Sequence, residues 1–228
     1  MASQYRKYWL CGIIGAILFG IGDVLLGFVD PESVSSYFRV LKTGHGAAYP
    51  LYRIFITMFL GTLGIPFLTL GCVRMADIYR ERKTRRIMRF VMAMIPFGWM
   101  IIHFTVSSGV WLYSFMMHKG NTVMAVSAAE AMISMYKPAQ VLSWFMAGTG
   151  LFILPVSVLF GKTVLPLRSQ WFTPALWMAL FSGLKYFFPV NPLINALDTL
   201  CMNAGMIIWF IYLLFVTDGE VVHETERQ

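Results

Sequence analysis

The chain has 228 residues, with 18 basic and 11 acidic side chains and a formal net charge of +7 at neutral pH. Hydrophobic residues make up 58% of it and charged residues only 13%, about half the charged share of an ordinary soluble domain. This composition excludes a typical soluble globular protein and indicates an integral membrane protein whose apolar side chains face lipid. The net positive charge is concentrated in one short segment without basic–aromatic repeats, so no nucleic-acid partner is expected.

Six apolar segments are long enough to be predicted as membrane-spanning helices. The fifth is the shortest, and the stretch 121–136 between the third and fourth is too short to cross; it is predicted to be an interfacial or re-entrant helix. The sequence therefore predicts an all-α bundle of six transmembrane helices in a single domain over residues 1–228. The six predicted spans are Tyr8–Val29, Pro50–Ala76, Ile87–Met117, Ala139–Phe160, Trp171–Pro189 and Leu193–Val216.

The loop after the second span predicts the orientation of the bundle. Between Arg80 and Arg89 it contains six basic residues and one acidic residue. Lysine and arginine in short loops favour the cytoplasmic side of a membrane, so this loop and, with an even number of spans, both termini are predicted to be cytoplasmic. The same basic residues are expected to contact anionic lipid headgroups.

The first span contains an aspartate within a row of small residues. Gly12, Ala16, Gly20, Asp23 and Gly27 recur at steps of three or four and so share one helix face. Small residues allow a neighbouring helix to approach closely. A carboxylate at the centre of a membrane helix costs about 2.5–3.5 kcal/mol to insert. Asp23 is therefore expected to face the bundle interior, about 9 Å from the outer end of the span at 1.5 Å per residue.

The last span carries a polar stripe that is expected to face protein or water. Its members cover an arc of about 140° at 100° per residue. Asp198 lies about 7 Å below the outer end of this span, so the sequence predicts that Asp23 and Asp198 meet at one level. The stripe consists of Asn191, Asn195, Asp198, Thr199, Met202 and Asn203.

These carboxylates and the polar residues of the third and fifth spans suggest an outward-facing polar pocket. In that pocket Lys185 would balance a carboxylate and His103 would form the floor. A simpler interpretation stays open for each residue: hydrogen bonds between helices, a Ser107 bond to its own helix, or a lysine that reaches the headgroups. The predicted ligand-binding residues are Asp23, His103, Ser107, Lys185, Asn195 and Asp198.

No cofactor and no metal site are predicted. The spans contain a single histidine and no HExxH pattern, and the three cysteines lack metal-ligand spacing. The sequence also has no GxSxG, phosphate-binding loop or dinucleotide fingerprint.

Two short motifs carry a family resemblance. The segments Gly22-Asp23-Val24-Leu25-Leu26-Gly27 and Ala196-Leu197-Asp198-Thr199 resemble an uncharacterised family of multi-pass bacterial membrane proteins. The resemblance implies a location in the bacterial cytoplasmic membrane and no particular chemistry.

Three functions remain open from the sequence. The first is binding or transport of a small solute, an ion or a lipid headgroup through the polar pocket. The second is a lipid-modifying enzyme that uses Asp23, His103 and Asp198 as acid–base groups. The third is a structural or assembly subunit without a ligand. Whether the protein is an enzyme and whether it forms homo-oligomers stay open.

Overall fold

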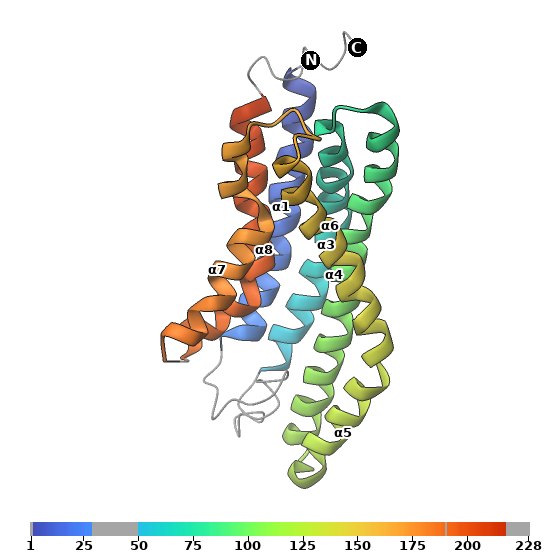
Figure 1. Ribbon diagram of the computed structural model, residues 1–228. Coiled ribbons are helices and arrows are strands. Elements are labelled where there is room, and N and C mark those ends of the chain that lie inside the picture. Colours follow the sequence, from blue (N-terminus) through green and yellow to red (C-terminus); the bar gives the residue numbers. More distant parts are fainter. Residues whose placement is uncertain (1, 29–49, 190, 218–228) are drawn as a thin grey trace.

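The computed structural model describes residues 2–28, 50–189 and 191–217, and this part of the chain folds into a helical bundle (Figure 1). Five of its helices are long and apolar enough to cross a membrane. They confirm five of the six predicted spans as helices; Val29, at the end of the first predicted span, lies outside the described residues. The five helices are α1 (Ala2–Gly27), α3 (Leu51–Met75), α4 (Arg82–His118), α6 (Lys137–Leu159) and α8 (Pro192–Thr217).

The predicted span Trp171–Pro189 is not one continuous helix, so the count of six spans is not confirmed. It begins in a 3-10 turn, η2 (Leu167–Phe172), and continues as the 14-residue helix α7 (Pro174–Phe187). Fourteen residues rise about 21 Å, short of the roughly 30 Å of a hydrocarbon core. Thr173 has an extended backbone, with φ −63° and ψ 142°. A proline sterically disfavours the α-helical conformation of the residue before it, which explains why α7 starts only at Pro174.

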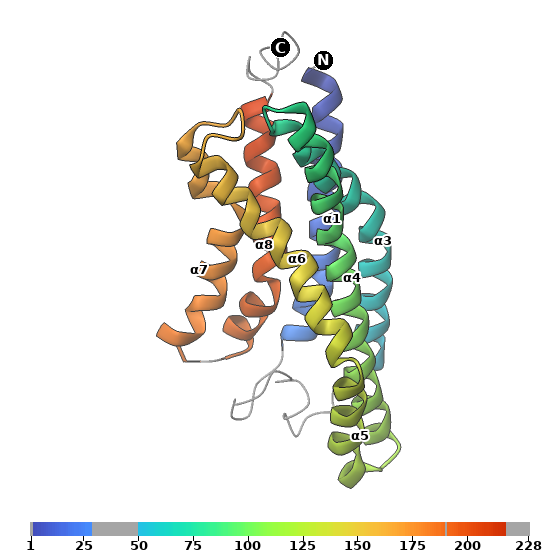
Figure 2. The same cartoon turned by 45° about the vertical axis from the view of Figure 1, so that its right-hand side comes forward.

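The predicted short helix between the third and fourth spans is present as α5 (Thr122–Met135). It packs against the far end of α4 and leads into α6 through Tyr136. Figures 1 and 2 show α5 and the end of α4 extending past the end of α1. The 37 residues of α4 rise about 55 Å, more than a hydrocarbon core requires. This hairpin therefore projects beyond one end of the bundle.

The packing of α1 against α3 and α8 forms the centre of the bundle. Gly71 of α3 lies so close to α1 that a Cβ atom there would be 2.6 Å from Gly12 Cα. The predicted small-residue face of α1 is buried against α3 and α8: Ala16 is fully buried, and a Cβ atom at Gly20 would lie 2.7 Å from Leu200. Close approach of this kind is the role of small residues in membrane helix pairs.

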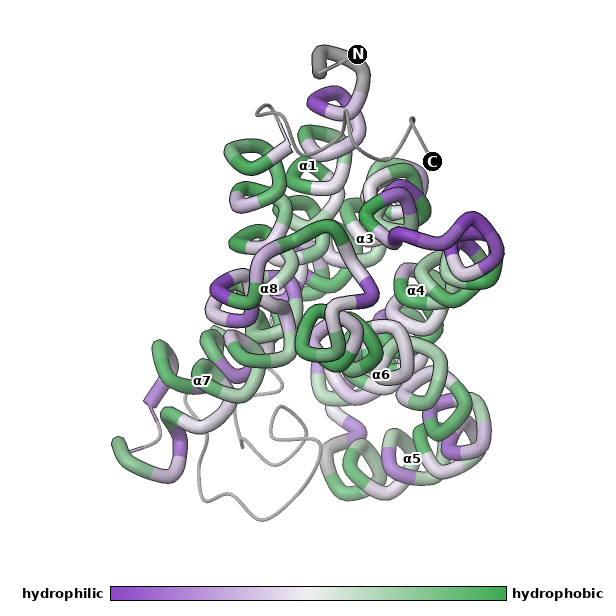
Figure 3. The backbone as a smooth tube through the Cα atoms, turned by 45° about the horizontal axis from the view of Figure 1, so that its top comes forward, coloured by the Kyte–Doolittle hydropathy of each residue, from purple (hydrophilic) through white to green (hydrophobic). Residues whose placement is uncertain are grey.

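The first and last helices are also joined near the chain termini. The buried indole nitrogen of Trp9 donates a 2.8 Å hydrogen bond to Thr217 Oγ1. The start of α1 and the end of α8 accordingly lie at the same end of the bundle (Figure 1). The hydrophilic turn between α3 and α4 stands out against the mostly apolar helices in Figure 3.

Candidate functional site

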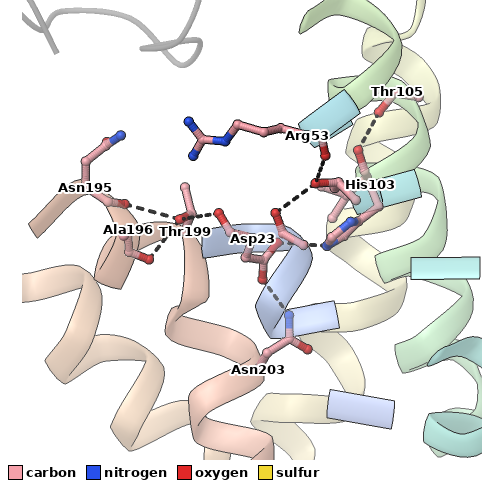
Figure 4. A network of polar contacts seen from close by, with 11 residues as sticks. Asp23, Arg53, His103, Thr105, Asn195, Ala196, Thr199 and Asn203 are labelled. Atoms are coloured by element: carbon pink, nitrogen blue, oxygen red, sulfur yellow. Dashed lines mark hydrogen bonds and ion pairs between the residues drawn. The ribbon is translucent and has the colours of Figure 1, made fainter. Parts of the chain in front are cut away.

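Asp23 lies inside the bundle and connects three helices. Only 6% of the residue is exposed. Its Oδ1 atom lies 2.8 Å from Nε2 of His103 on α4, and its Oδ2 atom accepts a 2.6 Å hydrogen bond from Nδ2 of Asn203 on α8 (Figure 4). The expectation that the carboxylate faces protein is confirmed. We call Asp23, His103 and Asn203 the carboxylate–histidine cluster.

The imidazole of His103 is surrounded mainly by aromatic rings. It packs edge to face on Phe19 at 4.9 Å between ring centroids, and the Trp99 ring lies 5.9 Å away. Asp23 Oδ1 lies off the direction of a ring N–H at Nε2, so the contact is not a linear hydrogen bond, and it is an ion pair only when the imidazole is protonated. Within the described residues, Nδ1 of His103 has no hydrogen-bond partner, and the backbone of Gly61 passes beside it. The Nδ1 edge of the imidazole is therefore buried without a hydrogen bond from the described part of the chain.

Side chains of α3 and α8 also hold the backbone of α1 around Asp23. Thr57 Oγ1 lies 3.1 Å from the carbonyl of Gly22 on α1 and 2.9 Å from the Arg53 carbonyl of its own helix. Thr199 Oγ1 lies 3.2 Å from the carbonyl of Asp23. Asn195 Nδ2 donates to the carbonyl of Gly27 at 2.6 Å. The carbonyls of a last helical turn have no partner within their own helix, so Asn195 caps α1. The predicted site residue Asn195 therefore contacts the backbone of α1.

Replacing Thr57 by valine tests the contribution of one of these bonds. The substitution keeps the side-chain shape and removes the hydroxyl that α3 shares between the Gly22 carbonyl of α1 and its own Arg53 carbonyl, so we expect the free energy of unfolding to fall by about 0.5–1.5 kcal/mol. Thr62→Val is the matched control, because Thr62 is exposed and its hydroxyl donates only to Met58 of its own helix. Equilibrium unfolding in mixed micelles measures both variants, and equal losses would contradict the interhelical role.

Asp198 belongs to a second polar cluster, between α7 and α8. Lys185 Nζ lies 3.0 and 3.1 Å from its two carboxylate oxygens, and Ser182 Oγ donates to Oδ1 at 2.7 Å. The Lys185 and Asp198 side chains are 20% and 17% exposed. The prediction that Lys185 neutralises a carboxylate agrees with this geometry. We call Asp198, Lys185 and Ser182 the lysine–aspartate cluster.

The six predicted ligand-binding residues thus do not form one cluster. Asp23 and His103 lie on one side of α8, and Lys185 lies on the other side with Asp198. Asp198 and Asn203 are five residues apart, which places them about 140° apart around the helix axis. One face reaches α1 and the other reaches α7. The two aspartates nevertheless lie at similar depth, because Thr199, next to Asp198, reaches the Asp23 carbonyl. The polar stripe of α8, which suggested a single pocket, covers an arc wide enough to contact both α1 and α7.

Ser107 and several residues that the sequence did not assign complete this region. Ser107 lies one turn after His103, is fully buried, and its hydroxyl has no hydrogen-bond partner within the described part of the chain. Asn203 was recognised as part of the polar stripe but not as a site residue; its four-residue spacing from Thr199 and Asn195 is the signal that could have found it. Thr57 carries no comparable signal, since it is an isolated hydroxyl in an apolar segment.

Histidine, cysteine and carboxylate side chains are the usual protein ligands of transition-metal ions. Among the described residues, no three histidine, cysteine, aspartate or glutamate side chains come together in a way that could hold a metal ion.

No curated protein and no solved structure matches the chain. A family model, described as a family of unknown function (DUF6796), matches residues 1–218. The chain belongs to this family of unknown function.

Proposed function

We propose that this protein binds a proton or a small cation at the carboxylate–histidine cluster and conducts it across a bacterial cytoplasmic membrane. Ionisable residues inside membrane helices are rare, and those that occur often mark ion and proton pathways. The observation that carries the proposal is the buried contact between Asp23 and His103, with hydrogen-bonding capacity left over in the same cluster.

The chemistry of the cluster suits a positively charged or proton-bearing ligand. The Asp23 carboxylate supplies negative charge, and Oδ1 of Asn203 is a buried acceptor without a partner among the described residues. Nδ1 of His103 is a second buried atom without a partner in that part of the chain, and it is an acceptor when the imidazole is neutral with its hydrogen on Nε2. A proton or small cation would satisfy acceptors that otherwise cost free energy when buried.

The position of the cluster favours access from the outer side. Asp23 lies one helical turn before the end of α1 at Gly27, whereas the basic turn that precedes α4 lies at the opposite end of the bundle (Figure 1). Under the positive-inside rule the basic end is cytoplasmic, so Asp23 lies in the outer half. The ligand would then enter from outside the cell.

A structural role is the second candidate, and a specific observation favours it. Hydrogen bonds from Thr57, Asn195 and Asn203 tie α1 to its neighbours, and Gly71 brings α3 into contact with α1. Such a seam would serve a membrane assembly subunit without a ligand. The lipid-modifying enzyme is less well supported, because Asp198 binds Lys185 and Ser182 instead of joining Asp23 and His103.

Ion flux into proteoliposomes distinguishes these functions. The purified full chain is reconstituted with a trapped pH-sensitive dye, and a potassium diffusion potential drives proton entry; parallel vesicles carry sodium- and potassium-sensitive dyes. We expect wild-type protein to conduct one of these ions and Asp23→Asn to abolish the flux with equal incorporation into vesicles. Asp198→Asn is the matched control and should retain the flux.

Two results would contradict the proposal. One is that the wild-type protein conducts none of the three cations. The other is that Asp23→Asn conducts as well as wild type and changes only thermal stability, which would support the structural candidate.

A further inference from the structure

The first turns of α4 carry four arginines on one helix face. Arg82, Arg85, Arg86 and Arg89 follow the spacing i, i+3, i+4 and i+7, which places side chains together along a helix. They line a cleft of about 300 Å³. The turn between α3 and α4, from which this part of α4 begins, is coloured as hydrophilic in Figure 3. This cleft lies at the other end of the bundle from Asp23 and is independent of the function proposed above.

Most of the positive charge around this cleft is not neutralised by the protein. Arg89 pairs with Asp77 at 2.8 Å, and Asp77 also pairs with Arg74 at 3.2 Å. No ion pair joins Arg82, Arg85 or Arg86 to another described residue. The neighbouring carboxylate of Glu81 accepts a hydrogen bond from Thr84. About three guanidinium charges therefore face the cleft.

The surface that follows the arginines is apolar and exposed. Phe90 is 70% exposed, and Phe97 and Phe104 continue the same stripe at 46% and 55%. Arg86 precedes Phe90 by one turn, so the stripe runs directly into the arginine face. Because exposed aromatic side chains on a spanning helix contact lipid tails, the cleft lies at the level of the lipid headgroups.

We propose that this arginine cleft binds the phosphomonoester headgroup of an anionic phospholipid. The planar guanidinium donates two parallel hydrogen bonds to phosphate oxygens, which a set of lysines would not reproduce. A phosphomonoester carries about 1.5–2 negative charges near neutral pH, which matches three unneutralised arginines better than the single charge of a phosphodiester. The adjoining phenylalanines would contact the acyl chains of the same lipid.

Lipid titration of the purified full chain tests this site. Short-chain phosphatidic acid, short-chain phosphatidylglycerol and inorganic phosphate are titrated separately, and binding is followed by thermophoresis in detergent. We expect phosphatidic acid to bind at least fivefold more tightly than phosphatidylglycerol, and inorganic phosphate to bind far more weakly than either lipid. R85Q/R86Q should weaken phosphatidic acid binding about 25-fold, at about fivefold for each charge removed.

The controls separate a defined site from diffuse charge. K83Q/R168Q removes the same total charge from exposed positions that do not line the cleft, and should change binding less than threefold. R85K/R86K keeps the charge but loses the planar fork, and should weaken binding about fivefold. Equal losses in R85Q/R86Q and K83Q/R168Q would overturn the site, as would phosphatidylglycerol binding as tightly as phosphatidic acid. Inorganic phosphate binding as tightly as phosphatidic acid would reassign the cleft to a free anion and overturn the lipid proposal.

Discussion

Replacing His103 by phenylalanine is expected to lower the free energy of unfolding by about 3–5 kcal/mol, because the buried Asp23 carboxylate then keeps only one of its two side-chain partners among the described residues, Asn203. Phenylalanine keeps the ring that packs on Phe19 and Trp99, so the loss reports the contact with Asp23 and not a cavity. Equilibrium unfolding in mixed micelles measures the change. His118→Phe is the matched control, since His118 is exposed and contacts a carbonyl of its own helix.

The double variant D23L/H103F distinguishes the ion pair from general disruption. Replacing both members of a buried pair by apolar residues is often neutral, but D23L also leaves Asn203 Nδ2 without its acceptor. We therefore expect the loss in the double variant to be smaller than the sum of the losses in D23L and H103F. It should also fold without conducting the cation that the wild-type protein conducts. A loss in the double variant equal to the sum of the two single losses would show that the two residues act independently, and the pair would then have no special role.

The extent to which the fold could be predicted depends on the length of each apolar segment. Five long segments appear as helices whose described ends lie within about six residues of the predicted ones, since about 20 apolar residues leave few alternatives to a spanning helix. The segment from Trp171 to Pro189 is predicted incorrectly as a full span, because its composition is apolar throughout although its helix begins only at Pro174. Hydropathy averages over a window and does not register the backbone constraint of a single proline.

The sequence predicts which residues belong to the candidate site better than it predicts which of them contact one another. The cost of burying a charge was sufficient to place Asp23 inside the bundle, and helical spacing was sufficient to give Asp198 a similar depth. Neither consideration reveals which helix packs on which side of α8. That choice sends Asp198 to Lys185 on α7 and Asp23 to His103 on α4, and it depends on tertiary packing that one helix cannot encode.

The packing of α1 against α3 gives the second prediction of a large effect, at a glycine that makes no polar side-chain contact. Replacing Gly71 by alanine would put a methyl group 2.6 Å from Gly12 Cα and 2.9 Å from the ring of Phe210. Because the nearest atom belongs to the backbone of α1, no side-chain rotation relieves the contact, and α1 and α3 must separate. We expect the free energy of unfolding to fall by about 1–3 kcal/mol.

Gly148→Ala in α6 is the matched control for Gly71→Ala. The nearest atom to a Cβ at Gly148 is 4.0 Å away, so the methyl group fits, and alanine should stabilise the helix by about 0.5–1 kcal/mol over glycine. Separation of α1 and α3 would also shift Asp23 relative to Asn203 and Thr57, so Gly71→Ala should reduce cation flux although it changes no polar group. A Gly71→Ala protein as stable as Gly148→Ala would mean that the interface between α1 and α3 is looser than its geometry requires.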